Sequence, residues 1–95
     1  MYGLTIKPEA DKIFRKLSKK NQAQLRIIHK KITEIQNEPH RDYKFLRKPM
    51  QHFNRVHIDT HFVLLFTLDH QHEIVEIWYF DHHDFVYEWR HGGKH

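Results

Sequence analysis

Apolar residues recur at helical spacing in the first half of the chain. After an alternating stretch at residues 2–7, which predicts a short strand, Pro8 opens a segment with apolar residues three and four positions apart. Asn21 can cap a second segment of the same spacing, which runs to about Asn37. The residues predicted to face inward are Ala10, Ile13, Phe14, Leu17, Leu25, Ile28, Ile32 and Ile35. The first half therefore predicts a strand followed by a helical hairpin with one apolar side.

The second half of the chain has the patterns of strands. Residues 37–50 contain two prolines and predict a loop. Residues 53–59 alternate, and residues 61–68 are apolar at nearly every position, as in a central strand covered on both faces. A polar turn at 69–72 leads to a last strand at 73–80. The predicted fold is α+β, in the order β-α-α-β-β-β with a short C-terminal segment, with an antiparallel strand meander packed against the helical hairpin.

The alternating strand separates apolar side chains from basic ones. Val56 and Ile58 share one face, and Arg55 and His57 share the other. Because the apolar face should meet the helical hairpin, the opposite face should carry the basic side chains. The last strand should then deliver the histidines at 82 and 83 to the edge of that second face.

The amino-acid composition limits the classes of protein to which the chain can belong. A chain of 95 residues predicts a single domain over 1–95, with 90–95 as a flexible tail. It has no cysteine, which excludes disulfides and thiolate zinc sites, and 16 Lys and Arg against 12 Asp and Glu give a net charge of +4. The positive charge favours a polyanionic partner such as nucleic acid. With no apolar run long enough for a bilayer and no signal peptide, we expect a cytoplasmic protein without a membrane partner.

Eleven histidines raise the question of a metal site. His82 and His83 are adjacent, and adjacent residues of a strand point to opposite faces, so they rarely bind one ion. His70 and His72 could share a face, but they lie in a predicted exposed turn with no evident third ligand. We therefore expect no metal and no other cofactor.

The same residues fit cleavage of RNA without a metal. That reaction needs a base for the 2′-hydroxyl, an acid for the leaving oxygen and a cation that stabilises the phosphorane. His57, His82 and His83 suit proton transfer near neutral pH, and Arg55 suits the phosphate. Tyr87 could stack on a base of single-stranded RNA.

Each of these residues also has an alternative, purely structural interpretation. Arg55 could pair with an acid, and His57 could be an ordinary exposed strand residue. Phe85 and Trp89 are predicted to close the end of the core.

The order of the elements and four short motifs resemble the RelE/ParE toxin superfamily of type II toxin–antitoxin systems. The motifs are "LRKPM" before the second strand, "RVHID" within it, "HFVLLF" in the third and "DHHDFVY" after the fourth, and the resemblance covers about residues 2–89. The resemblance implies a RelE-like fold and, for the RelE branch, a ribosome-dependent mRNA endonuclease that inhibits translation. It also implies a RelB-like antitoxin as partner, besides the mRNA and the ribosome.

The resemblance implies roles for particular residues. Family members place basic residues on the second strand, where this chain has Arg55 and His57, and a basic residue or histidine after the last strand, where it has His82 and His83. The tyrosine that follows corresponds to Tyr87. We expect His57 and His83 to transfer protons, Arg55 to bind phosphate and Tyr87 to orient the nucleotide. His82 is the second histidine candidate and an RNA-binding residue.

One position departs from the family pattern. Many members open the third strand with an aromatic–arginine pair, and here the pair is Phe62 and Val63. Arg47 or Lys48, in the preceding loop, would have to replace the missing arginine in binding RNA. The alternatives are a ParE-like poison of DNA gyrase and a catalytically weakened module that binds RNA or antitoxin.

Overall fold

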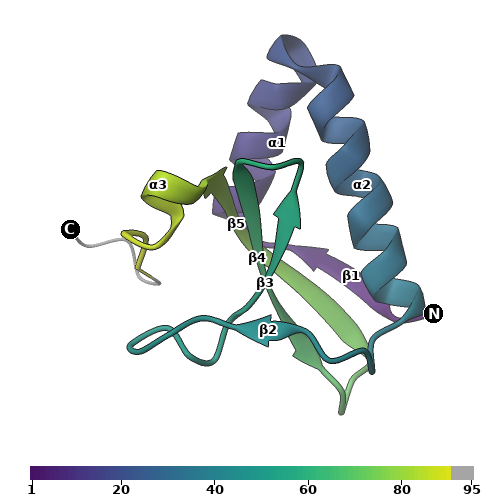
Figure 1. The fold of residues 1–95 in the computed structure, drawn as a ribbon. Coiled ribbons are helices and arrows are strands. Elements are labelled where there is room, and N and C mark those ends of the chain that lie inside the picture. Colours follow the sequence, from purple (N-terminus) through teal and green to yellow (C-terminus); the bar gives the residue numbers. More distant parts are fainter. Residues whose placement is uncertain (91–95) are drawn as a thin grey trace.

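The computed structural model describes residues 1–90, and Figure 1 shows the arrangement of its elements. In chain order they are β1 (Gly3–Ile6), α1 (Pro8–Lys20), α2 (Gln22–Asn37), β2 (Lys44–Phe45), β3 (Asn54–Ile58), β4 (Phe62–Asp69), β5 (Ile74–His82) and α3 (His83–Val86). Apart from Arg90, the tail predicted at 90–95 lies outside the described residues. Within those residues no helix has both the length and the apolar character needed to cross a bilayer. The order of elements confirms the predicted α+β fold and adds β2 and α3.

The strands form one sheet in the order β1-β5-β4-β3-β2. β3, β4 and β5 pair antiparallel, as the predicted meander requires. β1 pairs parallel with β5, because the helical hairpin carries the chain away from β1 before the meander begins. β2 pairs antiparallel with β3, with Lys44 opposite Arg55. The loop predicted at residues 37–50 is therefore wrong at Lys44–Phe45, since two residues have no detectable period and pairing with β3 makes them a strand.

The two long helices lie together along one face of the sheet (Figure 1). Pro8 occupies the first turn of α1, and the Asn21 side chain caps α2 by accepting from the Gln24 backbone N–H at 3.1 Å. The buried side chains of this layer are Tyr2, Ala10, Phe14, Ile28, Ile32, Ile35, Ile58, Leu64, Phe66, Val75, Ile77 and Phe80. Ile13, Leu17 and Leu25 pack against them while partly buried. The inward-facing positions predicted from helical spacing are thereby confirmed.

The opposite face of the sheet is covered by the chain between β2 and β3 and by the segment after β5. Its buried side chains are Leu46, Met50, Phe53, Val63, Leu65, Val86 and Trp89. In β4, Val63 and Leu65 face this second cluster, whereas Leu64 and Phe66 face the helices. All four are 0% exposed, which confirms the predicted central strand covered on both faces, although it spans Phe62–Asp69 and leaves His61 in the preceding turn.

The aromatic residues after β5 differ in burial. Trp89 is 6% exposed and joins the second cluster, as predicted, whereas Phe85 is 57% exposed. The prediction that Phe85 closes the core is wrong, because residues 83–86 form a helical turn rather than an extended chain. A helix repeats after about 3.6 residues, so Val86 and Trp89 share the side that faces the sheet, and Phe85 points away.

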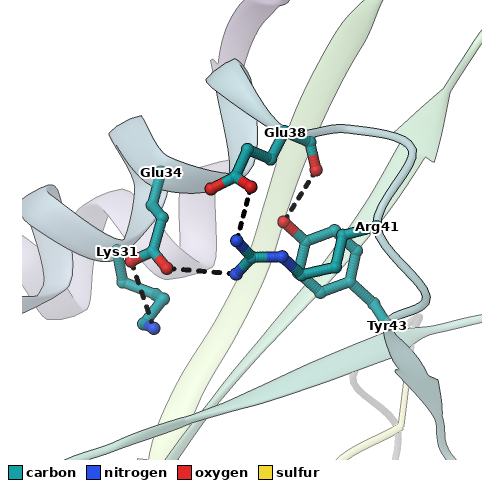
Figure 2. A network of polar contacts seen from close by, with 5 residues as sticks. All are labelled: Lys31, Glu34, Glu38, Arg41 and Tyr43. Carbon is teal, nitrogen blue, oxygen red and sulfur yellow. Dashed lines mark hydrogen bonds and ion pairs between the residues drawn. The ribbon is translucent and has the colours of Figure 1, made fainter.

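A polar network ties the end of α2 to the chain that leads into β2 (Figure 2). The Glu34 carboxylate lies 3.2 Å from the Lys31 ammonium and 3.2 Å from the Arg41 guanidinium, and Arg41 also binds Glu38. The Tyr43 hydroxyl donates to the Glu38 carbonyl at 2.9 Å. Hydrogen bonds from Lys31 and then Arg41 hold the pKa of Glu34 below its usual value. The network therefore fixes the approach to β2.

Glu34→Gln tests how much this network contributes to the stability of the fold. A carboxyl with a lowered pKa stabilises the fold above its unfolded pKa, near 4.3, and this contribution disappears as pH falls through the folded pKa. Because the group is partly exposed, we expect the variant to lower the free energy of unfolding at neutral pH by less than about 1 kcal/mol. Urea unfolding at neutral and acidic pH measures the difference, which should shrink below about pH 4. Glu88→Gln, at an exposed position, is the control, and a loss equal at both pH values would contradict the expectation.

Candidate functional site

A basic strand residue and a C-terminal tyrosine meet on the face of the sheet opposite the helices. Arg55 lies in β3, where its neighbours across the sheet are Leu65 and then Tyr79. Its Nη1 donates to the Tyr87 hydroxyl at 3.3 Å, although the two residues are 32 positions apart. Tyr87 reaches this point because Val86 and Trp89, on either side of it, are both buried. The tyrosine itself stays 45% exposed and available to a ligand.

Arg55 and Tyr87 line a surface cavity of about 450 Å³. Its lining residues are Phe45, Leu46, Arg47, Lys48, Pro49, Met50, Arg55, Tyr87 and Arg90. Four of them are cationic, and none of these residues is acidic. The cavity therefore attracts anions, and its exposed aromatic rings can stack on planar groups.

The cavity contains two residues that the sequence did not single out. The Arg90 Nη1 donates to the Tyr87 carbonyl at 2.8 Å and to the Trp89 carbonyl at 2.9 Å, so its guanidinium is held beside the tyrosine. Phe45, from β2, is 60% exposed. Arg90 was assigned to the tail, although its position next to the buried Trp89 could have marked it as anchored. No feature of the sequence marks Phe45 as a residue of the cavity, because β2 itself was not predicted.

His57 lies beside the cavity on the same face of the sheet as Arg55. It is exposed, and the register places it opposite Val63, which is in turn opposite Asp81 on β5. The Asp81 carboxylate accepts a hydrogen bond from the Tyr79 hydroxyl at 2.8 Å. Burial, and then the Asp81 carboxylate, raise the pKa of Tyr79 far above its usual value. Tyr79 therefore stays neutral, and the Asp81 carboxylate lies in the same line of cross-strand neighbours as His57.

His82 and His83 gather at a different place from the one the sequence indicated. His82 ends β5 opposite Phe62, and the two rings meet edge to face at 5.4 Å, on the side that faces the helices. His83 begins α3 and places its Nδ1 3.1 Å from the Asp84 carboxylate. Both lie next to His61, a residue that the sequence did not suggest. Neither His82 nor His83 is among the residues that line the cavity.

The position of the missing family arginine is occupied by a core residue. Val63 is 0% exposed and belongs to the second apolar cluster. An arginine there would place a charge among Leu65, Val86 and Trp89, at a high cost in desolvation. Arg47 and Lys48 instead bring their charges to the cavity from the loop before β3, which is where the sequence placed the substitutes.

Comparison with known proteins identifies the family. No protein-family model matches the chain. An uncharacterized protein of Methanosarcina mazei is 52% identical over 87 residues, covering 92% of this chain and 100% of the relative. The protein named "Putative toxin RelE4" of Methanocaldococcus jannaschii is 49% identical over 88 residues, covering 93% of each chain.

Solved structures share the fold at lower sequence identity. The toxin–antitoxin complex RelBE2 of Mycobacterium tuberculosis contains a chain with a TM-score of 0.71 and 23% identity, covering 85% of this chain and 96% of that one. A metal-bound toxin of Helicobacter pylori has a TM-score of 0.75 and 17% identity, covering 90% of this chain and 99% of that one. Together with the extensive identity to the Methanocaldococcus protein, the shared fold shows that the chain belongs to the RelE/ParE superfamily of toxins from toxin–antitoxin systems.

Proposed function

We propose that this toxin is an endoribonuclease that cleaves mRNA on the ribosome and thereby inhibits translation. The observation that carries the proposal is the contact of Arg55 with Tyr87 at 3.3 Å, inside a cavity lined by four cationic side chains. A cation beside an exposed aromatic ring suits a phosphate and the base attached to its sugar. Single-stranded RNA offers both groups to a protein, whereas a duplex hides its bases.

The proposed reaction is an attack by the 2′-oxygen on the neighbouring phosphorus. The 2′-O–P bond forms, the P–O5′ bond breaks, and the products are a 2′,3′-cyclic phosphate and a 5′-hydroxyl. One group accepts the proton of the 2′-hydroxyl, and another gives a proton to the leaving 5′-oxygen. Arg55, with Arg47, Lys48 and Arg90 around it, would stabilise the charge that develops on the phosphorane.

His57 is the proton-transfer candidate that lies next to this cavity. It is exposed and two residues from Arg55 on the same face of β3, so a phosphate bound to Arg55 would place the adjacent ribose near it. The Tyr87 ring would stack on the base, and its hydroxyl, already in contact with Arg55, can give a proton. The role of His83 as the partner of His57 stays a prediction, because His83 lies in the histidine cluster at the end of β5.

The partner proposed for the toxin is a RelB-like antitoxin. The Mycobacterium tuberculosis chain of the same fold comes from a toxin–antitoxin complex. An antitoxin segment with acidic side chains would neutralise the cations around the cavity and exclude RNA from it. The same surface would then bind RNA in the free toxin and bind the antitoxin in the inhibited complex.

Induced expression followed by primer extension on cellular mRNA tests the proposal. We expect cuts within translated messages for the wild type, and a loss of about 10²–10⁴-fold in cleavage for His57→Ala if it transfers a proton. Tyr87→Ala should lose about 1–3 kcal/mol of stacking, while Tyr87→Phe should keep most of it. The matched control is His72→Ala, in the exposed turn between β4 and β5.

The same experiment separates the alternatives. Arrested growth with DNA damage and intact messages would contradict RNA cleavage and favour a ParE-like action on DNA gyrase. No phenotype in the wild type, with the fold intact, would indicate a module that binds RNA or antitoxin without cutting.

A further inference from the structure

Three histidines from two separate parts of the chain meet at the end of β5. His61 directly precedes β4, His82 ends β5 and His83 begins α3. The His83 backbone N–H donates to the His61 carbonyl at 2.8 Å, which fixes the separation of the two backbones. The His61 and His82 rings stack with centroids 5.9 Å apart, and those of His82 and His83 with centroids 4.4 Å apart. The cluster is thus a product of the sheet and lies apart from the residues of the cavity.

The separation of the ring nitrogens is close to that of a metal site. One nitrogen from each of His61, His82 and His83 lies within 4.8 Å of the others. Zinc–nitrogen bonds of about 2.0–2.1 Å in a tetrahedron require ligand atoms roughly 3.3 Å apart, so the rings must close by roughly 1.5 Å. Rotation of the His61 side chain can supply most of this movement, because the residue is exposed and only its ring contacts with His82 and His83 would have to change.

Asp84 is positioned as the supporting carboxylate of such a site. Its Oδ1 lies 3.1 Å from the His83 Nδ1. The His82 Nδ1 instead accepts a hydrogen bond from the Asp84 backbone N–H at 3.1 Å. A carboxylate that accepts a hydrogen bond from the His83 Nδ1–H leaves the Nε2 lone pair of that ring free for a metal, which is the usual arrangement around metal-bound histidines. Metal binding through the His82 Nε2 would require its proton to move to Nδ1, which lies 3.5 Å from the Asp84 Oδ2 and could then donate to it. The chain therefore supplies ligands and an orienting group together.

We propose that His61, His82 and His83 bind a divalent transition-metal ion, for which Zn²⁺ is the best fit. Imidazole ligands suit Zn²⁺, Ni²⁺ and Cu²⁺ and disfavour Mg²⁺ and Ca²⁺, which prefer oxygen. Three imidazoles leave one tetrahedral position for water or another ligand. The proposal departs from the sequence expectation of no metal, which considered His82 and His83 without a third ligand. The ion would link the turn before β4 to α3, and so hold the segment that carries Tyr87.

Calorimetric titration of the full-length protein, without a histidine tag, with ZnCl₂ tests the site. We expect one high-affinity Zn²⁺ per chain in the wild type and a loss of at least about 100-fold in affinity for His61→Ala, since a ligand should matter more than its supporting group. Asp84→Asn should lose about 10–100-fold. His72→Ala, at an exposed histidine outside the cluster, should bind as the wild type does. Wild-type affinity in His61→Ala, or no high-affinity site in the wild type, would overturn the proposal.

Cobalt substitution gives a readout that folding alone does not change. Co²⁺ bound in place of Zn²⁺ should show the intense visible absorption of a tetrahedral site in the wild type and lose it in His61→Ala and His83→Gln. Circular dichroism confirms that each variant is folded. An unchanged spectrum in both variants would place the metal elsewhere, for instance on other histidines of the chain, and would refute the assignment.

The metal proposal and the proposed RNA cleavage fail in different ways. If His83 binds metal only, His61→Ala and His83→Gln should lose Zn²⁺ alike and change RNA cleavage alike. If His83 transfers a proton, His83→Gln alone should lose cleavage while Zn²⁺ affinity stays at the wild-type value, a result that contradicts the metal site.

Discussion

Arg55→Ala should lower the rate of RNA cleavage by about 10²–10³-fold, the usual loss on removing one group that stabilises a developing negative charge. The Arg55 guanidinium is fixed by its strand and by its 3.3 Å contact with the Tyr87 hydroxyl, so it is preorganised for a phosphate. Arg90 is held beside Tyr87 by hydrogen bonds to the Tyr87 and Trp89 carbonyls, whereas Arg47 and Lys48 reach the cavity from the loop before β3. The expected loss is therefore larger in the cleavage rate than in RNA affinity.

Single-turnover cleavage of mRNA on programmed ribosomes measures this effect. Arg55→Lys should fall between wild type and Arg55→Ala, because lysine keeps the charge but loses the forked geometry. Arg26→Ala removes an exposed arginine from α2, on the helical side of the sheet, and is the matched control. A group that stabilises the phosphorane should cost far more than about twofold in rate when it is removed. If the cleavage rate of Arg55→Ala is within about twofold of the control rate, Arg55 is not part of the proposed site.

Salt dependence of RNA binding gives a second check on Arg55. Each cation that neutralises a phosphate of single-stranded RNA contributes about 0.7 to the slope of log affinity against log salt concentration. Arg55→Ala should lower that slope by about this amount, and Arg26→Ala should leave it unchanged.

Trp89→Ala should lower the free energy of unfolding by about 3–5 kcal/mol, as large-to-small changes at buried aromatic residues do. Trp89 is 6% exposed, stacks on Tyr79 with centroids 5.0 Å apart and meets Phe53 edge to face at 5.4 Å. Its indole N–H also donates to the Glu9 carboxylate at 3.0 Å, which ties the C-terminal segment to α1. Removing the indole ring opens a cavity in the second cluster and abolishes its contacts with Tyr79, Phe53 and Glu9.

Urea unfolding at neutral pH measures the loss, with Phe85→Ala as the matched control. Phe85 is an aromatic residue of the same segment but 57% exposed, so its truncation should change stability by less than about 0.5 kcal/mol. Similar losses for both variants would contradict the docking of Trp89. Because Trp89 anchors Tyr87 and Arg90, its variant should also lose RNA cleavage at temperatures where it remains folded.

The sequence by itself determined the elements and the faces they bury. Helical spacing identified the inward side of α1 and α2, and alternation in β3 placed Arg55 and His57 on the face opposite the helices. These patterns are local, because each reflects the period of one element against a single layer. Basic side chains in the loop before β3 were likewise visible as candidates, and Arg47 and Lys48 do line the cavity with Arg55 and Tyr87.

The tertiary structure alone decided which distant residues meet. The aromatic positions 85, 87 and 89 share a face if the segment is extended, but the turn at α3 buries Trp89 and exposes Phe85. His61 joins His83 because the pairing of β4 with β5 places Phe62 opposite His82. No local period encodes such pairings, since they depend on strand register and on the turn that follows β5. The sequence therefore supplied the cations and the histidines, and the fold separated them into a cavity around Arg55 and a cluster around His61.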